Sequence, residues 1–178
     1  FVEKAGKVHI VGQHAFNYAQ IFSTTELKRP MQSGLLNPKE KDALPVLNAI
    51  IGELVGKAKK DEVCVYCVPA KPIDQTREVS YHEDVLQQII AGYGYNVKVV
   101  EESIALAYEG LVDNDLTGIA ISMGAGMCNI CVMYQGMSSL SFSVARGGDW
   151  VDQNVANDCG CSIAKVIAIK ENSNQLDL

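Results

Sequence analysis

A bare glycine turn between two apolar runs is the feature of this sequence that most directly suggests chemistry. The stretch GIAISMGAGMCNICVMYQG, residues 118–136, places Gly124, Ala125 and Gly126 between the runs, with neither proline nor Asn-Gly in the turn. Successive backbone N–H groups that no side chain covers form a nest that can hold a phosphate oxygen. An ordinary hairpin that uses glycine for positive φ has the same composition. The turn alone leaves both interpretations open.

Two cysteine pairs with zinc-like spacing form a second candidate site. Cys64 and Cys67 lie in EVCVYCVP, and Cys128 and Cys131 lie in MCNICVMY, so that together they resemble a zinc tetrad. Each pair falls inside an apolar run typical of a strand, where positions i and i+3 point to opposite faces. A zinc knuckle instead needs thiolates that converge from a turn. We therefore expect reduced cysteines without metal in a cytoplasmic protein.

Composition limits the class of protein. The 178 residues are 48% apolar with a mean hydropathy of +0.06, which suits a globular chain of one domain or two small lobes. A net charge of −6 argues against a general nucleic-acid surface, because phosphate backbones need clustered Lys and Arg. No apolar stretch approaches the ~20 residues of a membrane span, and no signal peptide is visible. The chain begins at Phe1 instead of Met, so we expect its natural start to be missing.

Hydrophobic periodicity predicts the elements that must position the turn. Strands are expected at residues 6–12, 62–70, 96–102, 117–123, 127–135 and 137–145, and the strand at 62–70 is expected to be buried. Helices are expected at residues 13–22, 40–57, 102–111, 146–160 and 162–171, and between Asp74, a candidate cap, and Gly92. Residues 27–40 read as a polar loop.

The order of these elements predicts the fold class. Helix-covered strands followed by an antiparallel meander indicate an α/β protein with a mixed sheet. The polar link VDNDL separates two groups of elements. We therefore expect two lobes with a cleft between them, divided at about residues 113 and 114.

Five segments occur in a characteristic order along the chain. They are GKVHIVGQHAFNYAQ, LKRPMQSGLL, VYCVPAKPIDQTRE, VVEESIALAYEGL and the glycine-rich meander, and ARGGDWVDQNVA follows them. This order resembles the ATPase core shared by actin, the heat-shock chaperones and sugar kinases, and it is most similar to the bacterial actin homologue MreB. The resemblance covers most of the chain. It implies part of an actin-like ATPase fold, which is ribonuclease H-like, with mixed sheets and flanking helices. By this resemblance, residues 1–113 would be a portion of the first lobe, with a small subdomain insertion within about 13–40, and residues 114–178 would be the start of the second lobe.

The resemblance implies a site for ATP and Mg²⁺. Gly124, Ala125, Gly126 and Met127 would be a phosphate-binding hairpin whose backbone amides face the β- and γ-phosphates. Glu102 matches the carboxylate that orients or activates the attacking water in phosphoryl transfer. On the sequence alone, a glutamate favoured by the dipole at a helix N-terminus explains Glu102 equally well.

Two further pairs are implied in the same way. Gly147 and Gly148 would open the helix that approaches the phosphates, followed by Asp149 as an N-cap. Lys170 and Glu171 resemble the pair that brackets the adenosine. Solvent-facing helix charges are the alternative for this last pair.

Ser122 and Met127 depart from the family hairpin, which usually reads Asp-x-Gly-Gly-Gly-Thr. Ser122 stands at the Mg²⁺-site position, where a neutral hydroxyl cannot offset a divalent charge as a carboxylate does. Met127 removes a hydroxyl donor and keeps only its backbone N–H. Ser103 replaces the proline that follows the family glutamate. The first phosphate hairpin and the later adenosine motif are not found in the chain, so much of the cleft lies outside it.

We therefore expect an ATP-binding domain of an actin-, MreB- or chaperone-like ATPase that controls assembly or partner binding. The alternative is a non-hydrolysing pseudo-ATPase scaffold that acts by protein–protein interaction. Glu102 and the glycines favour the ATPase, whereas Ser122 and Met127 favour the scaffold. A sugar or acetate kinase fits less well, because no substrate carboxylate can be identified. The expected partners are proteins or further copies of the chain, with neither nucleic acid nor a membrane span.

Overall fold

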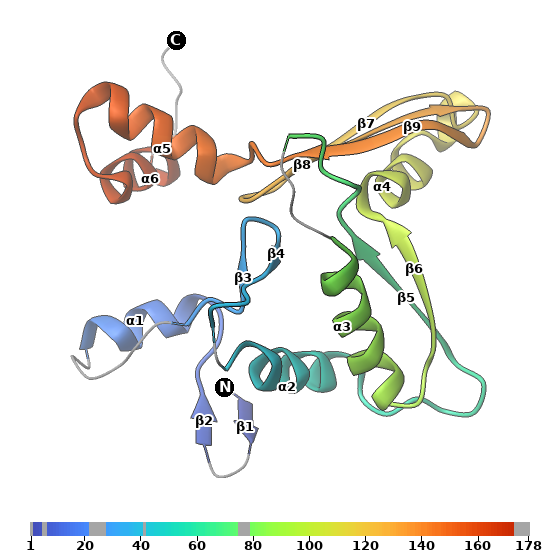
Figure 1. Cartoon of the computed structure of the whole chain (residues 1–178), viewed down its shortest axis with the longest axis horizontal. Helices are drawn as coiled ribbons and strands as arrows, with labels where there is room; N and C mark the ends of the chain where they lie inside the picture. Colours follow the sequence, from blue (N-terminus) through green and yellow to red (C-terminus); the bar gives the residue numbers. More distant parts are fainter. Residues whose placement is uncertain (1, 5–6, 22–27, 41, 75–78, 173–178) are drawn as a thin grey trace. The chain divides into compact units, whose positions relative to one another are not determined.

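A computed structural model describes residues 2–4, 7–21, 28–40, 42–74 and 79–172 of the chain (Figure 1). Contacts between Cα atoms divide the chain into two compact units. One unit comprises Phe1–Val68 and Glu78–Val100, and the other comprises Pro69–Arg77 and Glu101–Leu178. The chain therefore leaves the first unit after Val68, returns to it at Glu78, and leaves it again after Val100.

The first unit combines two small antiparallel hairpins with helices and a two-stranded sheet. Its elements are β1 (Val2–Lys4), β2 (Lys7–His9), α1 (Gln13–Ile21), β3 (Met31–Gln32), β4 (Leu35–Leu36), α2 (Ala43–Val55), β5 (Val63–Val68), α3 (Val79–Gly92) and β6 (Asn96–Glu101). β1 pairs with β2, β3 with β4, and β5 with β6. Figure 1 draws β5 and β6 in the same direction, and α3 connects them as parallel strands require.

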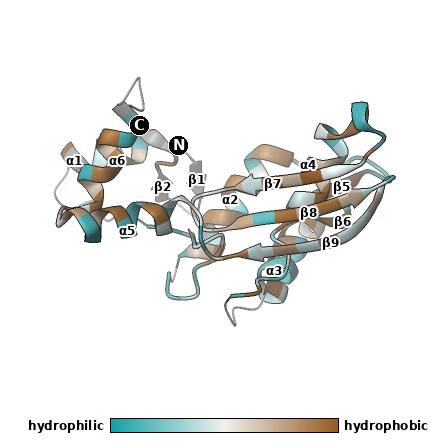
Figure 2. Cartoon of the chain, turned by 90° about the horizontal axis from the view of Figure 1, so that it is seen from above, coloured by the Kyte–Doolittle hydropathy of each residue, from teal (hydrophilic) through white to brown (hydrophobic). Residues whose placement is uncertain are grey.

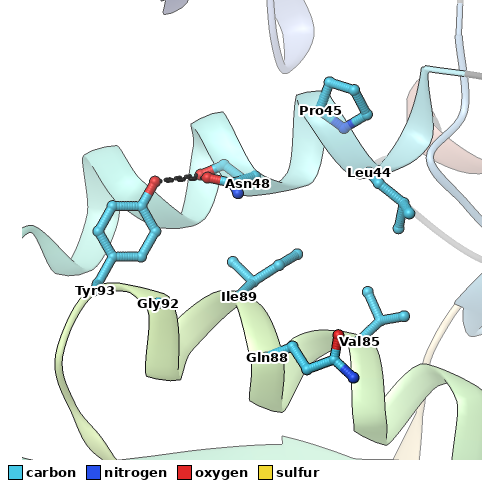
Figure 3. A pocket seen from close by; sticks show the side chains of 8 residues that line it. All are labelled: Leu44, Pro45, Asn48, Val85, Gln88, Ile89, Gly92 and Tyr93. Carbon is cyan, nitrogen blue, oxygen red and sulfur yellow. Dashed lines mark hydrogen bonds between the residues drawn. The ribbon is translucent and has the colours of Figure 1, made fainter.

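Helices α2 and α3 pack through a tyrosine placed against a glycine. A Cβ at Gly52 would lie 2.1 Å from Tyr93 Oη, so a larger residue there would force the tyrosine ring to move. Tyr93 Oη donates to Asn48 Oδ1 at 2.7 Å. Beside this contact the helices border an open groove of about 740 Å³ (Figure 3). Its lining residues are Leu44, Pro45, Asn48, Val85, Gln88, Ile89, Gly92 and Tyr93.

Two expectations for this unit need correction. β5 is not buried throughout, since its side chains alternate and Val63 and Val65 are 52% and 60% exposed. α3 contacts β5, and a helix on one face of a sheet leaves alternate side chains uncovered. The polar loop at residues 27–40 contains the β3–β4 hairpin, turned by Ser33 and Gly34 at positive φ. Strands of two residues are too short to show a period.

The second unit is built on an antiparallel meander, as predicted. Its elements are α4 (Glu102–Gly110), a 3₁₀ turn (Val112–Asn114), β7 (Gly118–Met123), β8 (Cys128–Tyr134), β9 (Met137–Val144), α5 (Gly148–Cys159) and α6 (Ile163–Asn172). The strand order is β7-β8-β9. Helix α4 contacts all three strands.

A segment from the middle of the chain extends this meander at β9. Pro72 forms a parallel bridge with Ser143, and Ile73 N–H donates to the Ser143 carbonyl at 3.0 Å. Asp74 Oδ1 accepts a hydrogen bond from Ala145 N–H at 2.9 Å. The described part of α3 begins at Val79, and residues 75–78 lie outside the described chain, so the expected Asp74 cap stays a prediction.

The core of the second unit lies between α4 and the meander. Ala107, Ala120, Cys131 and Met133 are buried there together. Side chains of β7 that alternate with Ala120 point away from this core. They are Ile119, Ile121 and Met123, which are 63%, 58% and 65% exposed. Figure 2 shows brown, apolar segments on the strands of the meander, with a teal, hydrophilic segment within β8.

The division of the whole protein into two lobes stays a prediction. By its contacts α4 groups with the meander, so the two units divide after Val100, ahead of the expected boundary at 113/114. The insertion expected within residues 13–40 includes α1 and the β3–β4 hairpin. Residues 22–27 of that insertion are outside the described chain.

The cysteines lie where the strand interpretation put them. Cys64 and Cys67 are on β5, Cys128 and Cys131 are on β8, and none of these four is part of a disulfide. Within the described ranges, no cluster of three or more His, Cys, Asp or Glu residues is arranged to hold a metal ion. The expectation that the protein binds no zinc stays a prediction. None of the described helices has the length and apolar character that crossing a membrane requires.

Candidate functional site

The glycine turn is a four-residue loop between β7 and β8. It runs from Gly124 to Met127 and is closed by a hydrogen bond from Gly124 N–H to the Met127 carbonyl at 2.9 Å. Neither Gly124 nor Gly126 has a positive φ. The usual reason for glycine in a tight hairpin therefore does not apply here.

The loop presents unpaired backbone donors. In the described part of the chain, the N–H groups of Ala125, Gly126 and Met127 make no hydrogen bond. Ala125 is exposed and Gly126 is half-buried, whereas Met127 is 2% exposed and anchors the loop. The free amides of Ala125 and Gly126, with little side chain above them, fit a phosphate group, and the buried Met127 fixes the end of the loop beside them.

Helix α5 holds the loop by hydrogen bonds to the backbone carbonyl groups of the loop. Gly148 N–H donates to the Gly124 carbonyl at 2.9 Å, and Asp149 N–H donates to the Ala125 carbonyl at 2.8 Å. A Cβ at Gly147 would lie 2.5 Å from both of these carbonyl oxygens. The N-cap of α5 is Gly147, and Asp149 lies within the first turn, so the expectation of an Asp149 cap was wrong. The first amides of α5 thus hold the loop, with its carbonyls turned toward the helix.

Glu102 lies at the base of the same hairpin. It begins α4 directly after β6, and its Oε1 accepts a hydrogen bond from Ser122 Oγ. Its Oε2 accepts a hydrogen bond from Asn129 Nδ2 at 3.2 Å. Ser122 and Asn129 are direct partners in the β7–β8 ladder. The structure therefore brings Glu102, Ser122 and the loop together, and neutral donors engage both oxygens of the carboxylate.

Asn129 is the site residue that the sequence did not reveal. It is 2% exposed, and its Oδ1 accepts a hydrogen bond from Ala70 N–H at 3.0 Å. Its amide thereby joins the Glu102 carboxylate to the segment that follows β5. An asparagine within the apolar run MCNICVMY was the available signal, because a polar residue in a buried strand needs specific partners.

Lys170 and Glu171 are placed on α6, and no described contact joins them to the loop. Lys170 Nζ lies 2.8 Å and 2.7 Å from the two carboxylate oxygens of Asp152 on α5. The Asp152 side chain is only 5% exposed. Glu171 is exposed and makes no hydrogen bond or ion pair within the described residues. The contacts of Lys170 therefore tie α6 to α5.

The side chains at the base of the loop do not form a carboxylate site for Mg²⁺. Ser122 is neutral, and both oxygens of Glu102 already accept hydrogen bonds. Mg²⁺ is held in proteins by carboxylates, usually together with substrate phosphates. The loop fits a phosphate group, whereas its surroundings do not fit a divalent ion held by the protein alone.

Comparisons with known proteins agree with this fold. A family model described as Volactin matches residues 1–178. A solved MamK double helical filament has a TM-score of 0.67 at 20% identity, over 91% of this chain and 50% of its own. MreB5 of Spiroplasma citri bound to ADP has a TM-score of 0.62 at 15% identity, over 93% of this chain and 51% of its own.

A third solved structure is the ethanolamine utilization protein EutJ from Carboxydothermus hydrogenoformans. It has a TM-score of 0.54 at 19% identity, over 83% of this chain and 51% of its own. No curated protein matches the chain. The chain spans about half the length of the solved structures that it matches. These similarities show that it has the fold of the actin-like ATPases, as expected from the sequence.

Proposed function

Because the chain belongs to the Volactin family and has the actin-like ATPase fold, we propose that it binds a nucleotide that controls assembly or partner binding. The free amides of Ala125, Gly126 and Met127 are the observation that carries this proposal. The solved structures of MreB5 with ADP and with AMPPNP, and the MamK filament, support it by analogy. The partners are proteins or further copies of the chain, in the cytoplasm.

Each candidate residue has a role in this proposal. The loop from Gly124 to Met127 binds phosphate oxygens through its backbone, and Gly147 and Gly148 hold the loop in place. Glu102 is the catalytic carboxylate. Lys170 and Glu171 are proposed to contact the nucleoside, and the bond from Lys170 to Asp152 would then fix the position of the lysine.

Nucleotide binding is tested by placing a large side chain on the loop and measuring the affinity for nucleotide. Isothermal titration calorimetry of the full-length protein with ADP and with ATP, in the presence of Mg²⁺, gives the dissociation constants. Gly124→Leu should weaken binding at least tenfold, because hydrogen bonds to charged groups contribute about 1.5–3 kcal/mol each. Gly124 has a negative φ and only one ordinary contact near its Cβ position, so the backbone tolerates leucine.

Gly110→Leu is the matched control in the same unit. A Cβ at Gly110 meets no atom within 4 Å, and this residue ends α4 instead of lining the loop. It should leave the affinity unchanged. Absence of binding by the unaltered protein, or equal affinity in Gly124→Leu, would overturn the proposal.

A second candidate function is a scaffold that binds nucleotide without hydrolysing it. It is favoured by the neutral hydroxyl of Ser122 at the Mg²⁺-site position and by the occupied oxygens of Glu102. Steady-state phosphate release distinguishes the two candidates. A scaffold releases phosphate far more slowly than the ~1 s⁻¹ typical of enzymes. Turnover at that rate, abolished by Glu102→Ala, would identify the ATPase instead.

A further inference from the structure

Three hydrogen-bonded side chains at the base of the loop have the arrangement of an activated hydroxyl nucleophile. Ser122 Oγ donates to Glu102 Oε1, and Asn129 Nδ2 donates to Glu102 Oε2. A serine hydroxyl becomes an effective nucleophile when an adjacent base takes its proton and a third group orients that base. Asn129 is buried and is itself held by Ala70 N–H, so it can orient the carboxylate.

We infer that Ser122 accepts a phosphoryl group from a nucleoside triphosphate bound at the Gly124–Met127 loop. Glu102 is the general base of this step, and Asn129 is a positioning residue that acts through Glu102. The inference rests on the proposed nucleotide binding and adds a covalent product, a phosphoserine on β7, to it.

The step conserves atoms and charge. Ser122 Oγ forms a bond to the γ-phosphorus while the bond from that phosphorus to the β,γ-bridging oxygen breaks. The electron pair of the broken bond leaves with the nucleoside diphosphate. The hydroxyl proton passes to Glu102 Oε1, along the hydrogen bond that the structure contains. The products are phosphoserine, a nucleoside diphosphate and a proton.

Serine is favoured over water as the acceptor because of where its hydroxyl lies. Ser122 Oγ is already hydrogen-bonded to Glu102 Oε1, on the carboxylate that would take its proton. An attacking water would first have to be bound at one of the remaining acceptor positions of Glu102. Holding a reactant permanently beside its base also removes the entropic cost of recruiting it.

The loop lies within reach of this hydroxyl. Ser122 precedes Gly124 by two strand residues, a separation of about 7 Å along β7. Ser122 is half-buried, so it is shielded from bulk water yet not sealed from a ligand at the loop. Backbone amides aimed at the phosphates stabilise the charge that develops during transfer.

The test measures phosphate incorporation and nucleotide binding in the same preparation. The full-length protein is incubated with Mg²⁺ and ATP labelled at the γ-position, and the labelled peptide is identified by mass spectrometry. Label on Ser122 is expected. Ser122→Ala should abolish incorporation, and Glu102→Gln should lower its rate by about 10²-fold or more. Ser139→Ala, at an exposed β9 serine whose side chain makes no hydrogen bond in the described chain, should leave it unchanged.

Asn129→Ser tests the positioning role separately. This variant loses the amide donor that holds Glu102 Oε2. The rate of incorporation at saturating ATP should therefore fall about tenfold or more, while the dissociation constant for ATP stays the same, because a misplaced base slows the reaction without weakening binding. A rate equal to that of the unaltered protein would overturn the role of Asn129.

Calorimetry with ATP separates the failure of this inference from the failure of nucleotide binding. ATP binding without incorporation, or with label on another residue, overturns the transfer to Ser122 and leaves the proposed function intact. Absence of ATP binding overturns both. Ser122→Ala that still binds ATP with wild-type affinity shows that its loss of label is not due to misfolding.

Discussion

Replacement of Gly147 by alanine should destabilise the second unit through the contact between α5 and the loop. The added Cβ would lie 2.5 Å from the carbonyl oxygens of Gly124 and Ala125, and 2.7 Å from the Ala125 carbonyl carbon. All three are backbone atoms, so no flexible side chain can move aside. Gly147 itself has φ −85° and ψ −165°, which alanine adopts without strain. The cost is therefore steric.

The size of the effect follows from the bonds that must give way. Moving the loop away lengthens the hydrogen bonds from Gly148 N–H and Asp149 N–H, each contributing about 1 kcal/mol. Residual crowding adds about 1–3 kcal/mol. A total of about 3–5 kcal/mol lowers the melting temperature of a chain of this size by about 6–20 °C.

Thermal and urea unfolding, followed by circular dichroism, measure this change. Gly110→Ala is the control, because nothing lies within 4 Å of its Cβ position and alanine favours a helix. It should be neutral or slightly stabilising. A Gly147→Ala protein within about 0.5 kcal/mol of the unaltered chain, the range of an ordinary surface substitution, would refute the close approach of α5 to the loop.

Three further predictions concern charge. Burial lowers the pKa of His82, so the stability that depends on its neutral form is present above the unfolded pKa of about 6.5 and is lost as the pH falls toward the folded pKa. Urea unfolding near neutral pH and near pH 5.5 measures how much unfolding free energy the protein loses between the two pH values. This loss should be smaller in His82→Gln than in the unaltered protein, and an equal loss would contradict the prediction. Lys170→Met leaves the buried Asp152 carboxylate unpaired and should cost about 1–3 kcal/mol, less than a fully buried pair because Lys170 is half exposed; Asp152→Asn in the same protein should restore most of the unfolding free energy, and no restoration would disprove the pairing. Ser122→Asp places a second carboxylate beside Glu102, so the melting temperature should fall without Mg²⁺ and rise on its addition more than in the unaltered protein; an identical response to Mg²⁺ would exclude a metal site there.

The sequence by itself determined the order of the elements and the position of the loop. Apolar periods of 3.6 and 2 residues placed the long helices and the meander, because these patterns follow from backbone geometry alone. The glycines marked the loop from Gly124 to Met127, and the resemblance of five ordered segments predicted the fold that the comparisons show.

Only the tertiary structure decided what the site residues touch. Gly147 is needed because the loop carbonyls approach it, and Asn129 joins Glu102 to Ala70, a residue 59 positions away. Asp74 accepts a hydrogen bond from Ala145 N–H, 71 positions away. Local patterns do not encode such partners, because a hydrogen bond between distant segments depends on how the chain packs. The hydrogen bond from Ser122 to Glu102 is of this kind, because the packing of α4 against β7 brings the hydroxyl within hydrogen-bonding distance of the carboxylate.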